Sequence, residues 1–142
     1  MYNASKTIER ALNSIKEQTF KCNYQIIVVN DGSKDNSQEI VEKYIADNPE
    51  LNITLINQLN GGVSKARNTG LKQASGNFIA LLDSDDAWKQ KKIEEQVNVF
   101  KTCQHVDFLG TGFAGFGINA EDGRLQRIFF KDLLFRNYFQ PS

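Results

Sequence analysis

The chain has 142 residues, of which 40% are hydrophobic and 24% are charged. Its 17 Lys and Arg residues balance 17 Asp and Glu residues, which gives a formal net charge of zero. This composition is typical of a soluble globular domain and excludes a disordered chain. A chain without excess positive charge has no overall field that attracts phosphate backbones, so we expect no nucleic-acid partner.

The cysteines and the apolar runs indicate the cellular compartment. Cys22 and Cys103 lie far apart and outside any metal-ligand spacing, and a chain of this size does not need disulfides. We therefore predict two reduced thiols. The longest apolar run, 78–82, is far shorter than the roughly 18 residues that span a bilayer, and no signal peptide precedes the first predicted helix. These features predict a cytoplasmic location and leave open an attachment to the cytoplasmic face of the membrane.

Apolar residues in the first hundred positions alternate between helical and strand-like spacing. Apolar residues three and four apart indicate helices, and short β-branched runs such as 26–29 indicate buried parallel strands. The predicted elements, in chain order, are a helix within 4–18, a strand over 24–30, a helix capped by Asp35 or Ser37 and ended by Asn48-Pro49, a strand over 53–57, a helix over 63–74, a strand over 78–83 and a helix over 89–102.

The remaining residues predict less regular structure. We expect an extended stretch over 106–116, a hairpin turn at 121–123 and an aromatic helix over 129–138. Aromatic and basic residues are mixed over 127–139, a pattern that also suits a membrane surface but that favours packing onto this domain or onto the missing half. If this surface is left uncovered, it favours a homodimer. We treat residues 1–142 as one domain.

Strands that alternate with helices of about a dozen residues predict an α/β fold with a mostly parallel sheet and helices on both faces. In such sheets ligands bind at the carboxyl ends of the strands. That rule points to two acidic segments, residues 30–33 after one strand and residues 83–86 after another.

The second segment places Asp83, Asp85 and Asp86 within four residues. Three such carboxylates repel one another unless they are solvated or hold a cation, and Mg²⁺ or Mn²⁺ prefers oxygen ligands of this kind. The alternative is an acidic turn that stabilises the N-terminus of the next helix. Taken alone, the segment fits both interpretations.

Gly61-Gly62 opens the helix predicted over 63–74. A Gly-Gly turn at a helix start presents backbone N–H groups to an anion, and Arg67 lies close by as a charge partner. The alternative is a plain loop followed by a solvated arginine.

Five motifs in register resemble the family 2 glycosyltransferases, the large inverting group with the Rossmann-like GT-A fold. The resemblance covers about residues 1–100. The motifs are Tyr-Asn-Ala at 2–4, Ser-Ile-Lys-Glu-Gln-Thr-Phe at 14–20, Ile-Val-Val-Asn-Asp-Gly-Ser-Lys-Asp-Asn-Ser at 27–37, Asn-Gly-Gly-Val-Ser-Lys-Ala-Arg-Asn-Thr-Gly at 60–70 and Leu-Asp-Ser-Asp-Asp-Ala-Trp at 82–88.

The resemblance implies a role for each candidate residue. Tyr2 would pack against the base, and Asp31 would accept a hydrogen bond from a ring N–H, which selects uracil. Asp83 would lie near the ribose, and Asp85 would bind the Mn²⁺ or Mg²⁺ that bridges the diphosphate. The supporting members of the site would be Asp86 and Arg67.

The chain also departs from the family pattern. Asn30 stands where the family usually has an acidic residue. The family begins with an apolar strand that ends in Pro-x-Tyr-Asn, whereas this sequence starts at Met1, so the opening strand is missing. The family's general base belongs to an acceptor half beyond Ser142. We interpret 121–122 (Glu-Asp) as part of a turn and assign no catalytic residue.

The sequence therefore predicts a sugar transferase with a UDP-sugar donor, a metal-held diphosphate, inversion at the anomeric carbon, and a carbohydrate or lipid-linked acceptor in surface polysaccharide or glycoconjugate synthesis. One alternative is a non-catalytic nucleotide-sugar-binding domain. Another is a receiver-type signalling module, but that module needs a lone phosphorylatable Asp after its third strand, which residues 83–86 do not match.

Overall fold

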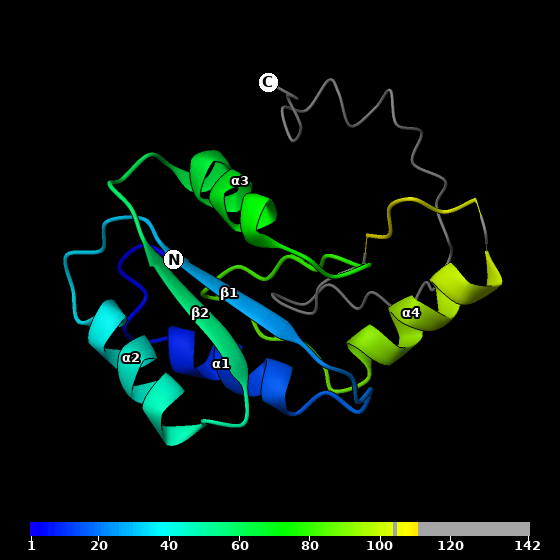
Figure 1. Ribbon diagram of the computed structural model, residues 1–142. Helices are drawn as coiled ribbons and strands as arrows, with labels where there is room; N and C mark the ends of the chain where they lie inside the picture. The colour runs from blue at the N-terminus through cyan, green and yellow to red at the C-terminus, as the bar shows by residue number, and fades with distance from the viewer. Residues whose placement is uncertain (104, 111–142) are drawn as a thin grey trace, which may run out of the picture. The chain divides into compact units, whose positions relative to one another are not determined.

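The computed structural model describes residues 1–103 and 105–110 (Figure 1). The chain divides into two compact units, Met1–Gln104 and His105–Ser142. Every helix and strand below belongs to the first unit, and residues 105–110 contain neither. The predicted turn at 121–123, the predicted helix over 129–138 and most of the predicted extended stretch over 106–116 lie outside the described residues.

All but one of the elements predicted within the first unit are confirmed, with boundaries shifted by a few residues. The observed order is α1 (Ile8–Lys16), β1 (Gln25–Asn30), α2 (Ser37–Asp47), β2 (Asn52–Asn57), α3 (Val63–Gln73) and α4 (Lys92–Thr102).

The two strands pair in parallel, with Gln25 opposite Asn52 at one end and Asn30 opposite Asn57 at the other. The chain leaves β1, forms α2 and returns as β2 in the same direction, which is the strand–helix–strand unit predicted from the sequence.

Helices cover both faces of this sheet (Figure 1). On one face Ile26 and Val28 join a buried core with side chains of α1 and α2, including Leu12 and Val41. On the other face α3 crosses β1 so closely that a Cβ on Gly70 would lie 3.6 Å from Val29 Cγ2. The alternation of β1 side chains between two helical layers explains why residues 26–29 of the strand are all apolar.

The start of α2 is tied to the N-terminal loop. The Asp35 carboxylate accepts hydrogen bonds from the backbone N–H of Ser37 at 3.1 Å and of Ser5 at 3.0 Å, and the Ser37 hydroxyl accepts from the N–H of Ala4 at 2.8 Å. The side chain of Asn36, which occupies the N-cap position, makes no capping bond. The Asp35 carboxylate therefore caps the first N–H of α2, as predicted, although Asp35 lies one residue before the N-cap position. The hydrogen bond from the Ser37 hydroxyl is the main reason that the pKa of Asp35 falls to about 2.

The prediction of a strand over 78–83 is wrong: these residues form neither a strand nor a helix. Their β-branched and aromatic character fits a strand, but a strand also needs a neighbour that accepts and donates ladder hydrogen bonds. Among the described residues β1 pairs only with β2 and, at its last residues, with Met1. Residues 78–83 have no such neighbour.

In the part of the chain that the structure describes, no helix has both the length and the apolar character needed to cross a bilayer. Cys22 and Cys103 are free thiols, as predicted.

The core makes one quantitative prediction. Leu12 of α1 is 2% exposed and belongs to the core that α1 forms with α2 and β1. Leu12→Ala should therefore lower the free energy of unfolding by about 2 to 5 kcal/mol. Leu59→Ala is the matched control because Leu59 is 87% exposed, and it should change stability by less than about 0.5 kcal/mol. Urea denaturation measures both, and equal effects would contradict this placement of the core.

Candidate functional site

One cavity brings most of the predicted site residues together. It has a volume of about 1,090 Å³ and runs along β1 to the loops that follow the strand. We call it the central cavity. All the predicted site residues except Asp86 line it, namely Tyr2, Asp31, Arg67, Asp83 and Asp85.

Asp31 is the first residue after β1 and is only 4% exposed. Its Oδ1 accepts hydrogen bonds from Gln58 Nε2 at 2.7 Å and from the backbone N–H of Gly61 at 2.9 Å. Its Oδ2 accepts one from the backbone N–H of Gly62, also at 2.9 Å. The sequence predicted that the Gly-Gly turn would present N–H groups to an anion, and in the structure that anion is the Asp31 carboxylate.

These hydrogen bonds stabilise the ionised form of Asp31. The bond from Gln58 has the largest effect, the backbone N–H groups of Gly61 and Gly62 add to it, and together they hold the carboxyl pKa below its ordinary value against the opposing effect of burial. Asp31 is therefore a carboxylate at neutral pH. Because Oδ2 accepts only one of these bonds, it keeps an acceptor position for a further donor.

Two glycines shape the loops around this carboxylate. Gly32 has φ +72°, and a Cβ there would lie 2.9 Å from the backbone nitrogen of Asn60. Gly62 has φ +84°, which L side chains rarely adopt. The Asn60 side chain donates to the Asp31 backbone carbonyl at 2.9 Å. The close approach of the two loops thus depends on the missing side chain at Gly32, whereas Gly62 is needed for its positive φ, since a Cβ there would have no atom within 4 Å.

Asn30, which replaces an acidic residue of the family pattern, has a structural role. Its Oδ1 accepts from the backbone N–H of Ser33 at 3.1 Å, and its Nδ2 donates to Asn57 Oδ1 at 2.9 Å. The neutral amide therefore closes the turn after β1 and links it to the end of β2.

Arg67 and Asp83, 16 residues apart in the sequence, form a bidentate ion pair. Arg67 Nη2 donates to Asp83 Oδ1 at 2.8 Å and to Oδ2 at 3.1 Å. The pair joins α3 to the acidic turn and neutralises one of its three carboxylates. The sequence suggested Arg67 as a charge partner for an anion at the Gly-Gly turn, and in the structure its partner is Asp83 of the acidic turn.

The acidic turn itself is closed by the Asp86 N–H, which donates to the Asp83 carbonyl at 3.0 Å. Arg10 Nη2 donates to the Asp85 carbonyl at 2.5 Å, and this bond anchors the turn to α1. No described residue bonds the carboxylates of Asp85 and Asp86, and both residues are exposed.

The described residues contain no group of three acidic, His or Cys side chains that converge as a complete metal site. A Mg²⁺ or Mn²⁺ ion does not need one, because it is commonly held by one or two carboxylates together with phosphate oxygens and water. The unpaired Asp85 carboxylate in the central cavity fits that pattern. Asp86 lies outside the lining of the cavity, so the two acids are not equivalent.

Tyr2 lines the central cavity but is 48% exposed. Its neighbour Met1 is held at the end of β1, with the terminal ammonium donating to the Val29 carbonyl at 2.5 Å and the Met1 carbonyl accepting from the Asp31 N–H at 2.9 Å. Tyr2 therefore lies at the mouth of the site, next to the residue that carries the buried carboxylate.

Sequence reasoning missed two glutamines that position the site. Gln58 follows β2 and donates to Asp31, while Thr69 donates to Gln58 Oε1 at 2.6 Å and so orients its amide. Gln18 is fully buried: its amide donates to the carbonyls of Ser14 and Lys89 and accepts from the Ile93 N–H. It thereby fastens the chain after the acidic turn to α1.

A signal for Gln18 was present in the sequence, because a polar side chain that ends an apolar helix stripe requires buried partners. Gln58 gave no such signal, since it lies in a loop whose path depends on the fold.

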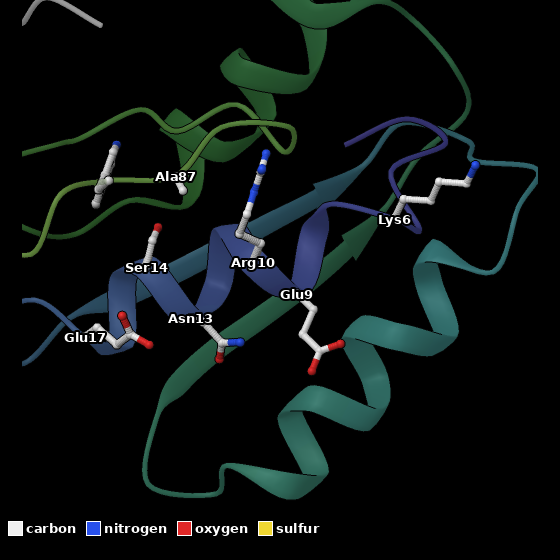
Figure 2. A pocket seen from close by; sticks show the side chains of 8 residues that line it. Lys6, Glu9, Arg10, Asn13, Ser14, Glu17 and Ala87 are labelled. Atoms are coloured by element: carbon white, nitrogen blue, oxygen red, sulfur yellow. The ribbon is translucent and has the colours of Figure 1, made fainter. Parts of the chain in front are cut away.

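A second, shallower hollow lies beside α1 and has a volume of about 520 Å³. Figure 2 shows Arg10 extending from α1 toward the chain segment that carries Ala87. The lining residues are Lys6, Glu9, Arg10, Asn13, Ser14, Glu17, Ala87 and Trp88. None of the predicted ligand-binding residues is among them.

Comparison with known proteins gives the family. The sequence model of the family described as glycosyl transferase family 2 matches residues 1–141. The chain belongs to this family.

Similar relatives and solved structures support this family membership. The chain is 41% identical over 98 residues to the Escherichia coli UDP-Glc:alpha-D-GlcNAc-diphosphoundecaprenol beta-1,3-glucosyltransferase WfgD, and the match covers 69% of this chain and 37% of WfgD. The structure resembles Staphylococcus aureus TarS 1–349 in complex with UDP, with a TM-score of 0.66 and 33% identity over 73% of this chain and 31% of that one.

It also resembles the mannosyltransferase PcManGT from Pyrobaculum calidifontis in complex with GDP-Man and Mn²⁺, with a TM-score of 0.67 and 27% identity over 70% of this chain and 30% of that one. The predicted α/β fold of the GT-A type is thus confirmed. The chain spans less than half the length of each of these proteins.

The hydrogen bond from Gln58 predicts a measurable change in the titration of Asp31. Gln58→Met should raise the pKa of Asp31 toward its ordinary value, because the largest stabiliser of the carboxylate is lost. In the parent chain the ionised group stabilises the fold at pH values above the unfolded-state pKa, and this contribution disappears as the pH falls through the lower folded-state pKa. In the variant this contribution should be smaller, and its loss should be complete at a higher pH, because the folded-state pKa lies closer to the unfolded-state pKa.

Carboxyl ¹³C NMR titration measures the shift directly. Gln73→Met is the matched control, since Gln73 is exposed on the last turn of α3. An unchanged Asp31 pKa in Gln58→Met would show that Gln58 does not stabilise the carboxylate.

Proposed function

We propose that this chain is the nucleotide-sugar-binding part of a glycosyltransferase that takes a sugar from a UDP-sugar donor and passes it to an acceptor hydroxyl. The observation that carries the proposal is the arrangement of Asp31, Arg67, Asp83 and Asp85 around one cavity at the carboxyl end of β1. These residues come from three separate loops and helices, and a ligand with a base, a ribose and a diphosphate matches their chemistry.

Asp31 is the proposed base-reading group. It is ionised, almost fully buried, and keeps an acceptor position on Oδ2. The N3–H of uracil is a ring donor that such an oxygen accepts, whereas the N3 of cytosine is an acceptor that it repels. Tyr2, at the mouth of the cavity, offers an aromatic face to the base. The structure of TarS with UDP supports this choice of donor.

Asp83 and Arg67 form the proposed ribose and phosphate side of the site. The ion pair between them fixes the direction of both side chains. A carboxylate oxygen accepts from ribose hydroxyls, and a guanidinium donates to phosphate oxygens. Their mutual contact keeps the two groups at the same end of the cavity.

Asp85 is the proposed ligand of a divalent cation, with Asp86 in a supporting role. When bound, Mn²⁺ or Mg²⁺ would neutralise charge on the diphosphate leaving group. The complex of PcManGT with Mn²⁺ supports a metal-assisted reaction in this fold. Arg10 holds the Asp85 backbone carbonyl, so the carboxylate projects from a turn that is already anchored.

In the proposed reaction the acceptor oxygen attacks the anomeric carbon from the face opposite the nucleotide, and the bond between that carbon and the diphosphate oxygen breaks. The configuration is inverted and UDP leaves with the bonding electrons. Arg67 stabilises the negative charge that develops on the leaving oxygens. No described residue is assigned as the base that removes the acceptor proton.

The acceptor is proposed to be a growing carbohydrate or a lipid-linked glycan of a surface polysaccharide, reached at the cytoplasmic face of the membrane. The support is the name of WfgD, which describes a glucosyltransferase whose acceptor is a diphosphoundecaprenol-linked sugar. TarS, named as a poly(ribitol-phosphate) β-N-acetylglucosaminyltransferase, is a second relative with a polymeric acceptor.

Thermal unfolding of the 142-residue chain tests the proposed site. UDP and Mn²⁺ together should raise the melting temperature by more than the sum of their separate effects, because each ligand completes the binding site of the other. Asp85→Asn should remove this excess. Asp47→Asn, on the exposed face of α2, is the charge-matched control and should keep it. A full joint effect in Asp85→Asn would show that the metal is held elsewhere.

A competition experiment tests base recognition. UDP should bind about tenfold more tightly than CDP, because a cytosine base leaves the Asp31 acceptor unpaired at a cost of about 1 to 3 kcal/mol. The two ligands share the ribose, the diphosphate and the size of the ring, so only the base edge differs. Isothermal titration in the presence of Mn²⁺ gives both affinities. Equal values would remove Asp31 from the base site while leaving the diphosphate site intact.

A further inference from the structure

The position of Tyr2 at the mouth of the central cavity depends on its neighbours in the chain. No described residue hydrogen-bonds the backbone or the hydroxyl of Tyr2, and the residue is 48% exposed. On one side of it, the Met1 carbonyl accepts from the Asp31 N–H at 2.9 Å. On the other side, the chain is held by Asn3.

Asn3 is bonded through two of its atoms to the loop that carries Asp31. Its backbone N–H donates to the Ser33 hydroxyl oxygen at 3.1 Å, and its side-chain Oδ1 accepts from the Lys34 N–H at 2.8 Å. Ser33 and Lys34 closely follow Asp31 in the sequence. Both sides of Tyr2 are therefore tied to the loop that also carries the buried carboxylate.

The backbone of Asn3 has a conformation that few residues adopt. Its φ is +50°, and no other residue except glycine has a positive φ in the part of the chain that the structure describes. Asparagine tolerates this left-handed region better than most residues, because its short side chain hydrogen-bonds locally. The turn at Asn3 takes the chain from Met1, beside the end of β1, to the residues that lead into α1. One asparagine thus provides both the turn and the bond to the neighbouring loop.

We propose that Asn3 is a positioning residue that fixes Tyr2 beside Asp31, so that an aromatic face and a carboxylate meet the same nucleobase. The inference rests on the proposed function, in which Tyr2 packs against the base and Asp31 accepts from its ring N–H. Asn3 is not among the residues that line the central cavity. It therefore acts through Tyr2 and does not touch the nucleotide.

The exposure of Tyr2 explains why such support matters. Packing holds a half-exposed side chain only in part, so the path of the backbone decides where the ring can reach. Ordering a mobile side chain when a ligand arrives lowers the affinity, and a residue that is already in place avoids this cost. The bonds of Asn3 therefore favour the base without adding a contact to it.

Three substitutions separate the side-chain bond of Asn3 from its backbone conformation. Asn3→Asp keeps an acceptor oxygen and tolerates a positive φ. Asn3→Gly keeps the φ and loses the acceptor, and Asn3→Ala loses the acceptor and disfavours the φ. Asn36→Ala is the matched control, because Asn36 is an exposed asparagine just before α2 whose side chain has no bonding partner among the described residues.

Amide hydrogen exchange and ¹⁵N relaxation of the 142-residue chain without a ligand test the positioning. The Lys34 N–H should lose about tenfold in protection in Asn3→Ala and Asn3→Gly. The order parameter of the Tyr2 amide should fall in both variants, and most of all in Asn3→Ala. Asn3→Asp and Asn36→Ala should keep the values of the parent chain. An unchanged Tyr2 order parameter in Asn3→Ala would overturn the proposal.

Calorimetric titration with two ligands in the presence of Mn²⁺ tests the consequence for the base. Ribose 5-diphosphate shares the ribose and the diphosphate of UDP and lacks its base. Asn3→Ala should weaken UDP binding about tenfold, which lies within the range for the loss of a base–aromatic stack. The affinity for ribose 5-diphosphate should stay the same. Equal weakening of both ligands would show a general loosening of the site and would contradict the proposal.

A double-mutant cycle asks whether Asn3 acts through Tyr2. In the Tyr2→Ala background, Asn3→Ala should cause little further loss of UDP affinity, and a loss as large as in the parent chain would refute the proposal. Failure of the proposed function has a different signature, because UDP would then bind the parent chain no more tightly than ribose 5-diphosphate does. The exchange and relaxation measurements decide in that case whether Asn3 positions Tyr2.

Discussion

The hydrogen bonds to the Asp31 carboxylate organise the site. A carboxylate that is 4% exposed is stable only if its oxygens are paired, and here the partners are Gln58 and the backbone of Gly61 and Gly62. These donors fix the path of the loop that opens α3, and α3 in turn carries Arg67. One buried charge at the end of β1 therefore sets the position of the guanidinium that reaches the acidic turn.

The acidic residues divide into two kinds as a result. Asp31 and Asp83 are paired within the protein, the first with neutral donors and the second with Arg67. The carboxylates of Asp85 and Asp86 have no partner among the described residues. Paired carboxylates keep their geometry when a ligand arrives, whereas an unpaired carboxylate is available to a cation. This division explains how several acids share one cavity without a converged cluster in the described part of the chain.

The acidic turn depends on contacts distant in sequence as well as on its own residues. Arg10 holds it from α1, and the buried amide of Gln18 fastens the segment that follows it. Residues 78–82, which precede it, have no comparable support from the sheet. The turn is thus anchored on its downstream side by α1 and α4 and on its upstream side mainly by the ion pair between Arg67 and Asp83.

The sequence by itself determined the helices, the paired strands and the candidate site residues, because apolar spacing and strand-end loops are local features that need no partner to be recognised. For the Gly-Gly turn it offered two interpretations, an anion-binding element and a plain loop. Only the tertiary structure decided that the anion at the turn is Asp31, that Gln58 supports this carboxylate, that Gln18 fastens the segment after the acidic turn, and that Asp86 lies outside the cavity that Asp85 lines. The strand expected over 78–83 was wrong for the same physical reason: local β propensity is carried by the sequence, but a strand exists only where a neighbouring backbone supplies its hydrogen bonds.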